Sequence, residues 1–87
     1  MPDDDFLVTP QFLAVYESLD DETAVAVDEV IRRLVDDPGT AWARRNRVSG
    51  DEGGAWLVEM SSGTTELALY WDLSDDRRLL LLLLVVR

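Results

Sequence analysis

The 87-residue sequence contains no cysteine, no histidine and no lysine. Without cysteine, the chain has neither a disulfide framework nor a thiolate nucleophile. Without histidine, it lacks the commonest general base and metal ligand. These absences exclude serine–histidine, cysteine–histidine and zinc chemistry, and we expect the protein to use no metal and no cofactor.

Basic charge is also scarce. Eighteen acidic residues against eight arginines give a net charge of −10. The distribution is uneven, because residues 1–37 hold eleven acidic residues and two arginines, whereas residues 38–87 hold seven and six. Two explanations fit a basic set made only of arginine: biased codon usage, or selection for guanidinium groups that bind phosphate or carboxylate.

The longest apolar run, Leu79 to Val86, has only eight residues. Crossing a bilayer takes about 20, and residues 1–5 lack the basic and apolar regions of a signal peptide. We therefore expect a cytoplasmic protein with no membrane partner. Because the run does not alternate with polar residues, it predicts a strand inside a sheet with both faces buried. Replacing Leu82 or Leu83 by Asp should then unfold the domain, since an unpaired charge would be buried.

Two amphipathic helices are predicted in the first half of the chain. Thr9 is suited to cap a helix that starts at Pro10, because proline needs no hydrogen-bond partner for its nitrogen there. A second helix should begin after Asp20 and run to about Asp36, before the Asp37-Pro38-Gly39 stop. The short connection between the two helices predicts an antiparallel hairpin.

The hydrophobic period changes from 3.6 to 2 after residue 40. Residues 41–48 form a plausible strand or extended arm, and alternation predicts strands at 56–60 and 67–73. Short loops between these strands and the last one indicate an antiparallel meander. With a short first strand near residues 6–9, we predict a single α+β domain over residues 1–87: a short N-terminal strand, a two-helix hairpin and an antiparallel β-meander.

This order of elements resembles the RelE/ParE superfamily of toxins from type II toxin–antitoxin modules. The resemblance spans nearly the whole chain and rests on Val8-Thr9-Pro10-Gln11-Phe12, Leu34 to Pro38, Trp56-Leu57-Val58-Glu59-Met60, Ser62-Gly63, Leu69-Tyr70 and Val86-Arg87. It implies a RelE/ParE-like fold and a toxin that cleaves mRNA on the ribosome without a metal, or that acts by another family route such as gyrase inhibition. The implied partners are a cognate antitoxin or another protein and the ribosome with its mRNA, but not DNA directly.

The resemblance also implies catalytic residues. Arg87 matches the family arginine near the end of the last strand, and Tyr70 matches its aromatic residue on the preceding strand. The sequence departs from the family where basic residues are usual, with Ser61 after one strand and Glu66 to Ala68 on the next. The alternative hypothesis is therefore a catalytically inactive protein of the same fold that binds a partner protein. In that case Tyr70 is a tyrosine on a half-exposed sheet face.

Arg44, Arg45 and Arg47 form a basic cluster within four residues. They are candidates for binding RNA phosphates or an acidic partner, and they join Arg87 in one patch if the arm lies beside the end of the last strand. The alternative is a surface cluster that pairs with the chain's own carboxylates. Glu59 and Glu66 on neighbouring strands are a further candidate pair, for acid–base catalysis.

The acidic first half of the chain favours a partner with basic residues. Antitoxins in this superfamily wrap their toxins, yet an acidic antitoxin segment would be repelled by the predicted helix pair. We therefore predict that a partner presents basic residues to the region of Asp20–Glu22 and Asp28–Glu29. Apolar anchors would supply most of the affinity, because exposed ion pairs contribute only about 0–1 kcal/mol each.

Overall fold

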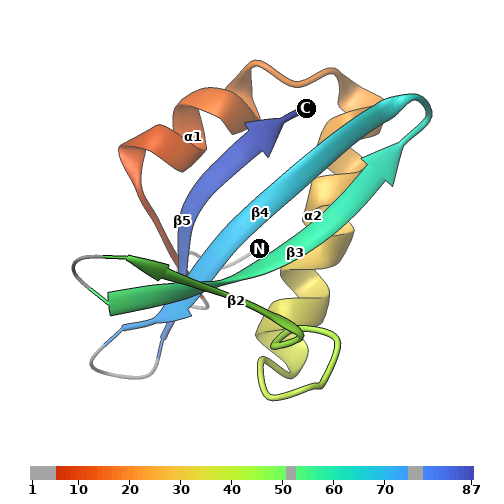
Figure 1. The fold of residues 1–87 in the computed structure, drawn as a ribbon. Coiled ribbons are helices and arrows are strands. Elements are labelled where there is room, and N and C mark those ends of the chain that lie inside the picture. The colour runs from red at the N-terminus through yellow and green to blue at the C-terminus, as the bar shows by residue number, and fades with distance from the viewer. Residues whose placement is uncertain (1–5, 51–52, 75–77) are drawn as a thin grey trace.

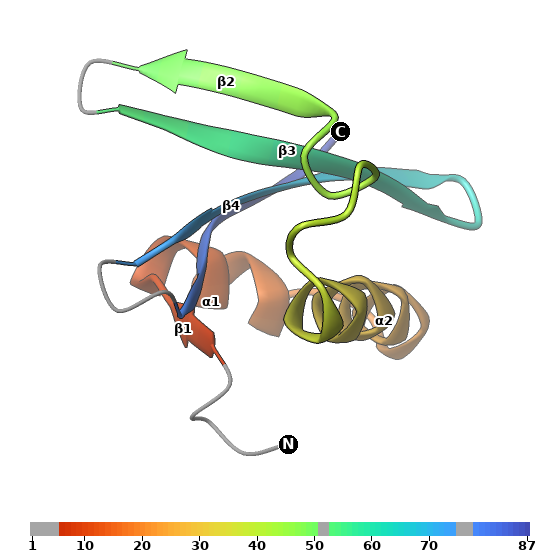
Figure 2. The same ribbon diagram turned by 90° about the horizontal axis from the view of Figure 1, so that it is seen from below.

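A five-stranded sheet with two helices on one side forms the domain (Figures 1 and 2). The computed structural model describes residues 6–50, 53–74 and 78–87, so parts of the loops expected at 49–54 and 74–76 lie outside the described residues. The elements are β1 (Phe6–Val8), α1 (Pro10–Glu17), α2 (Asp21–Asp36), β2 (Asn46–Gly50), β3 (Gly53–Ser62), β4 (Thr65–Leu73) and β5 (Leu79–Val86). The predicted α+β class is confirmed.

The sheet is mixed, with the strand order β1-β5-β4-β3-β2. Strands β2 to β5 run antiparallel to their neighbours, as expected of a meander, whereas β1 pairs with β5 in parallel. The last strand therefore lies between β1 and β4, and its predicted internal position is confirmed. The arm expected at residues 41–48 is mostly turns, because β2 begins only at Asn46.

Side-chain caps fix where both helices begin. The Thr9 hydroxyl accepts a hydrogen bond from the Phe12 amide at 3.1 Å, and it donates to the Leu82 carbonyl of β5 at 2.6 Å. The Asp20 carboxylate accepts from the Thr23 amide at 2.8 Å, and the Thr23 hydroxyl followed by this amide lowers the pKa of Asp20. The predicted helix starts are thus confirmed, and Thr9 also ties α1 to the sheet.

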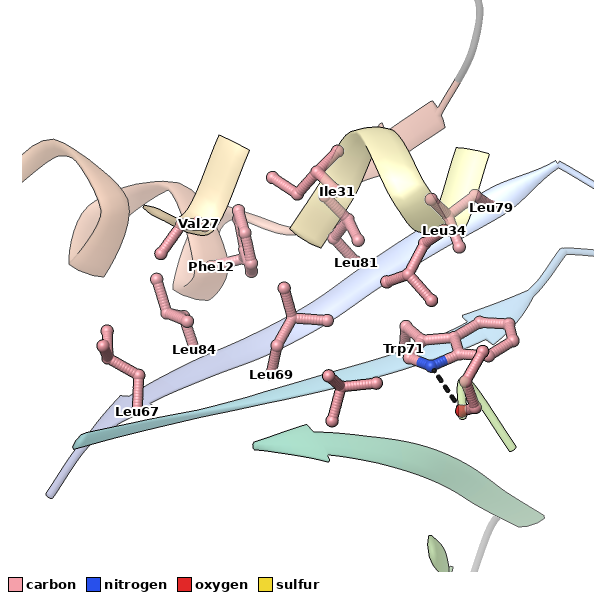
Figure 3. Packing of buried hydrophobic residues seen from close by; sticks show 12 residues of the cluster. Phe12, Val27, Ile31, Leu34, Leu67, Leu69, Trp71, Leu79, Leu81 and Leu84 are labelled. Carbon is pink, nitrogen blue, oxygen red and sulfur yellow. Dashed lines mark hydrogen bonds between the residues drawn. The ribbon is translucent and has the colours of Figure 1, made fainter. Parts of the chain in front are cut away.

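The core lies between the helices and one face of the sheet (Figure 3). Its buried members are Phe12 from α1, Val27, Ile31 and Leu34 from α2, and Val58, Leu67, Leu69, Trp71, Leu79, Leu81 and Leu84 from the sheet. The indole nitrogen of Trp71 donates to the buried carbonyl oxygen of Ala43 at 3.2 Å. This bond fastens the turns between α2 and β2 to the covered side of the sheet.

The expectation that both faces of the last strand are buried is wrong. Figure 2 shows both helices on the same side of the sheet, so the other side, here called the open face, has no helix over it. Leu81 pairs with Trp71 and Leu83 with Tyr70, which leaves Leu82 as an extra residue in a β-bulge. The bulge shifts the alternation, so that Leu84 is buried whereas Leu83 is 38% exposed on the open face. Because Leu83 is exposed, we no longer expect Leu83→Asp to unfold the domain.

Among the residues that the structure describes, no helix is both long and apolar enough to span a membrane.

Candidate functional site

The two residues that the resemblance marks as catalytic, Tyr70 and Arg87, project from the open face but do not meet. Tyr70 lies between Leu57 of β3 and Leu83 of β5, its direct cross-strand neighbours. The backbone N–H of Arg87 donates to the Glu66 carbonyl at 2.8 Å, four residues from Tyr70 along β4. At about 3.3 Å per residue, their backbones are roughly 13 Å apart. Tyr70 therefore has leucines directly across both neighbouring strands, and Glu59, which pairs with Arg87, lies diagonally from it on β3.

Arg87 is already paired with a carboxylate. Its guanidinium donates to Glu59 at 2.8 Å, and the two side chains are 45% and 56% exposed. Glu66 sits diagonally from Glu59 on the open face, since Ser61 pairs with Glu66 and Glu59 with Ala68. The patch thus holds two carboxylates and one guanidinium. A phosphate that approached Arg87 would compete with Glu59 for the guanidinium and would be repelled by both acids.

The expected acid–base pair, Glu59 and Glu66, is close enough in the sheet to be neighbours. However, the Glu59 carboxylate forms an ion pair with Arg87, and Glu66 is exposed. Across residues 6–50, 53–74 and 78–87, no group of three acidic side chains is placed to hold a metal ion.

The arginine cluster gathers on a tryptophan rather than on Arg87. The guanidinium carbons of Arg44 and Arg47 lie 4.7 and 4.4 Å from the centroid of the Trp56 ring. Trp56 in turn stacks on the buried Trp71, with ring centroids 4.7 Å apart. Arg47 also lies against Gly54, where an added Cβ would come within 2.8 Å of its guanidinium nitrogens. The two arginines are therefore held in place by aromatic and backbone contacts.

The single basic patch expected of Arg44, Arg45, Arg47 and Arg87 is not assembled. Trp56 pairs with Trp71, five residues along β4 from Glu66, which marks the position of Arg87. Trp56 also belongs to the covered face, whereas Arg87 belongs to the open one. Arg45 borders a small depression of about 150 Å³ that is also lined by Glu59. The cluster thus divides into an Arg44–Arg47 pair and a separate Arg45.

Sequence reasoning missed two features of the helix pair. The Tyr16 hydroxyl donates to the Asp28 carboxylate at 2.6 Å, which links α1 to α2. The Arg33 guanidinium lies 3.8 Å above the Trp42 ring, which links α2 to the turns that follow it. Tyr16 lies at helical spacing (i, i+4) from Phe12, but its partner twelve residues away depends on how the two helices pack. No local spacing signals that contact.

A scan against protein-family models found no match, and neither the curated proteins nor the solved structures yielded a significant one.

Proposed function

We propose that this protein is a protein-binding module: a non-enzymatic protein with a RelE/ParE-like fold that acts by binding a partner protein. The observation that carries the proposal is the Arg87–Glu59 ion pair at 2.8 Å, with Glu66 beside it. Phosphoryl transfer needs preorganised cations that converge on the phosphate oxygens. Here the implied catalytic arginine pairs with Glu59 beside Glu66, and the direct cross-strand neighbours of the implied tyrosine are two leucines.

Exposed apolar surface supports binding as the activity. Within the described residues, seven large apolar side chains are at least 36% exposed: Leu7, Val8, Leu13, Val25, Val48, Leu83 and Val86. Two of them, Val8 and Leu13, line one groove, and grouped exposed apolar side chains mark interaction sites more often than scattered single ones do. The net charge of −10 argues against RNA as the target, because RNA binding depends on cations that displace counterions from phosphates.

Controlled expression in growing cells tests the proposal. We expect the protein to accumulate without growth arrest and with cellular mRNA intact. A double variant, Tyr70→Phe with Arg87→Gln, should behave identically and serves as the matched control. Growth arrest with ribosome-dependent mRNA cleavage that the double variant lacks would overturn the proposal.

A second candidate function is the ribosome-dependent endoribonuclease of a toxin–antitoxin module. It is favoured by one observation: Tyr70 and Arg87 project from the same open face of the sheet, which no helix covers. If this candidate holds, Glu59→Gln should increase cleavage because it releases the Arg87 guanidinium. Arg87→Gln should abolish cleavage in the same assay. Equal mRNA integrity in both variants and the parent protein would exclude this candidate.

A further inference from the structure

An apolar groove opens between β1, α1 and α2, away from Tyr70, Arg87 and the Arg44–Arg47 pair. Its volume is about 460 Å³. Phe12 and Ile31 form its buried floor, and Val8 and Leu13 line it with side chains that are 39% and 41% exposed. Figure 2 shows α1 and α2 next to each other beneath the sheet, with β1 close to α1. The size and lining match those of sites that receive apolar groups.

Three polar side chains line the same groove. The Tyr16 hydroxyl donates to one carboxylate oxygen of Asp28 at 2.6 Å, and this carboxylate makes no other hydrogen bond to a described residue. Its second oxygen therefore remains available to a donor that enters the groove. Arg32 lies one helical turn after Asp28 on α2, and Val25, 55% exposed, lies about one turn before it.

The two helices that form the groove carry a strongly negative charge, although the groove lining itself holds one carboxylate, Asp28, and one guanidinium, Arg32. Residues 9–37, which contain both helices and their caps, hold eight carboxylates and two arginines, for a net charge of −6. Arg33 is directed onto the Trp42 ring, so Arg32 is the cation that borders the groove. Charges of one sign around a low-dielectric cleft concentrate the field there and attract ligands of the opposite sign.

We propose that this groove binds a basic amphipathic segment of a partner protein. Apolar side chains of the segment enter between Leu13 and Val8, and its lysine or arginine side chains face Asp28 and the other acids of the helix pair. The proposal rests on the proposed protein-binding function and names the chemistry of the partner. It follows from two independent observations, the apolar groove and the net negative charge of the helix pair that forms it.

Charge also excludes two other occupants. A second copy of this chain carries the same net charge of −10 and would be repelled. An apolar carboxylate, such as a fatty acid, would meet one favourable group, Arg32, within a surface of net charge −6. The apolar anchors of a cationic segment fit the apolar lining of the groove, and its cations are attracted by the negative charge of the helix pair.

Two synthetic peptides of about 15 residues, a length at which amphipathic helices begin to be stable, test the proposal. One carries leucine anchors at helical spacing (i, i+3, i+4, i+7) with lysine at the other positions, and the other has glutamate at every lysine position. Chemical-shift mapping on the isotope-labelled 87-residue protein should show saturable binding of the lysine peptide alone, with shifts centred on residues that line the groove. Leu13→Ser should weaken this binding by at least about tenfold, because a leucine contact is lost. Asp28→Asn should weaken it by up to about fivefold.

Leu83→Ser is the matched control, because Leu83 is exposed to a similar degree but lies on the open face. It should leave the affinity unchanged. If Leu83→Ser rather than Leu13→Ser weakened binding, the groove would be the wrong site, while the protein-binding function would stand. Failure of the lysine peptide to saturate, or equal binding of the glutamate peptide, would overturn the groove proposal. The proposed function is decided separately by the growth and mRNA assays.

Discussion

At the scale of single residues, Thr9 joins three parts of the chain. Its hydroxyl accepts from the Phe12 amide in the first turn of α1 and donates to the Leu82 carbonyl at the β-bulge. Its own amide donates to the Leu81 carbonyl at 3.1 Å. One side chain thus caps the helix and satisfies a carbonyl group that lies at the irregular part of β5.

Thr9→Val should lower the free energy of unfolding by about 1–3 kcal/mol. Valine keeps the shape of threonine but removes the hydroxyl, which leaves a helix amide and a strand carbonyl without a partner. Urea denaturation followed by circular dichroism measures the change. Thr9→Ser, which keeps the hydroxyl, should retain most of the stability, and an equal loss in both variants would show that the methyl group is what matters.

Tyr16 should titrate at unusually high pH. The hydrogen bond to Asp28, followed by burial and the negative charge of Asp28, raises the pKa of Tyr16 from 10.0 to about 12. Because the pKa is raised in the folded state, the stabilisation is fully present below pH 10 and is lost as the pH rises toward 12. Ultraviolet titration of a Tyr70→Phe variant, in which Tyr16 is the remaining tyrosine, measures the pKa directly. Adding Asp28→Asn should return it toward 10, and an unchanged pKa would contradict the assigned cause.

At the scale of elements, β5 stabilises the domain mainly through the face that packs against the helices. Leu81 and Leu84 are 0% and 1% exposed under the helices, whereas Leu83 is 38% exposed on the open face. Leu84→Ala should therefore cost about 2–5 kcal/mol of stability through the cavity it leaves. Leu83→Ala should cost less than about 1 kcal/mol.

Aspartate at the same two positions gives a sharper contrast. Leu84→Asp should unfold the domain because it buries an unpaired charge, and Leu83→Asp should leave a folded protein. Thermal melts of the two variants make the comparison. A folded Leu84→Asp variant, or an unfolded Leu83→Asp variant, would contradict the assignment of the two faces.

Sequence patterns predicted the elements of this fold better than their contacts. Both helix starts were predicted correctly from Thr9, Pro10 and Asp20, because capping depends on a few adjacent residues. The unbroken apolar run predicted an internal strand. It did not predict the bulge at Leu82, because eight similar residues do not indicate which of them pairs with which residue of β4. The Arg44 and Arg47 contacts with Trp56 depend on how the turns after α2 fold, and the Arg87–Glu59 pair depends on strand order. Neither is encoded in spacing along the chain.

At the scale of the whole molecule, charge asymmetry should govern how quickly a basic partner associates. With the lysine peptide, the association rate should fall steeply as salt rises from about 0.05 to about 0.5 M, because screening shortens the reach of the acidic surface. The dissociation rate should change little, since apolar contacts hold the complex. Stopped-flow measurements give both rates. An association rate that does not depend on salt would contradict charge steering.

A variant with Asp28→Asn and Glu29→Gln provides the control for that experiment. It removes two charges from the helix pair and should give a shallower salt dependence at the same peptide concentration. The two substitutions should change the association rate more than the dissociation rate.

The parallel pairing of β1 with β5 has a consequence for how the protein is made. Thr9 and Leu82 are hydrogen-bonded although 73 positions separate them in the chain. During synthesis, β1 and α1 are made well before β5, the strand on which both of them pack. Contacts between such distant segments also form slowly, because a long loop must close first. Pairing of β5 with β1 and β4 can therefore occur only after β5 has emerged, and until then α1 lacks the strand on which it packs.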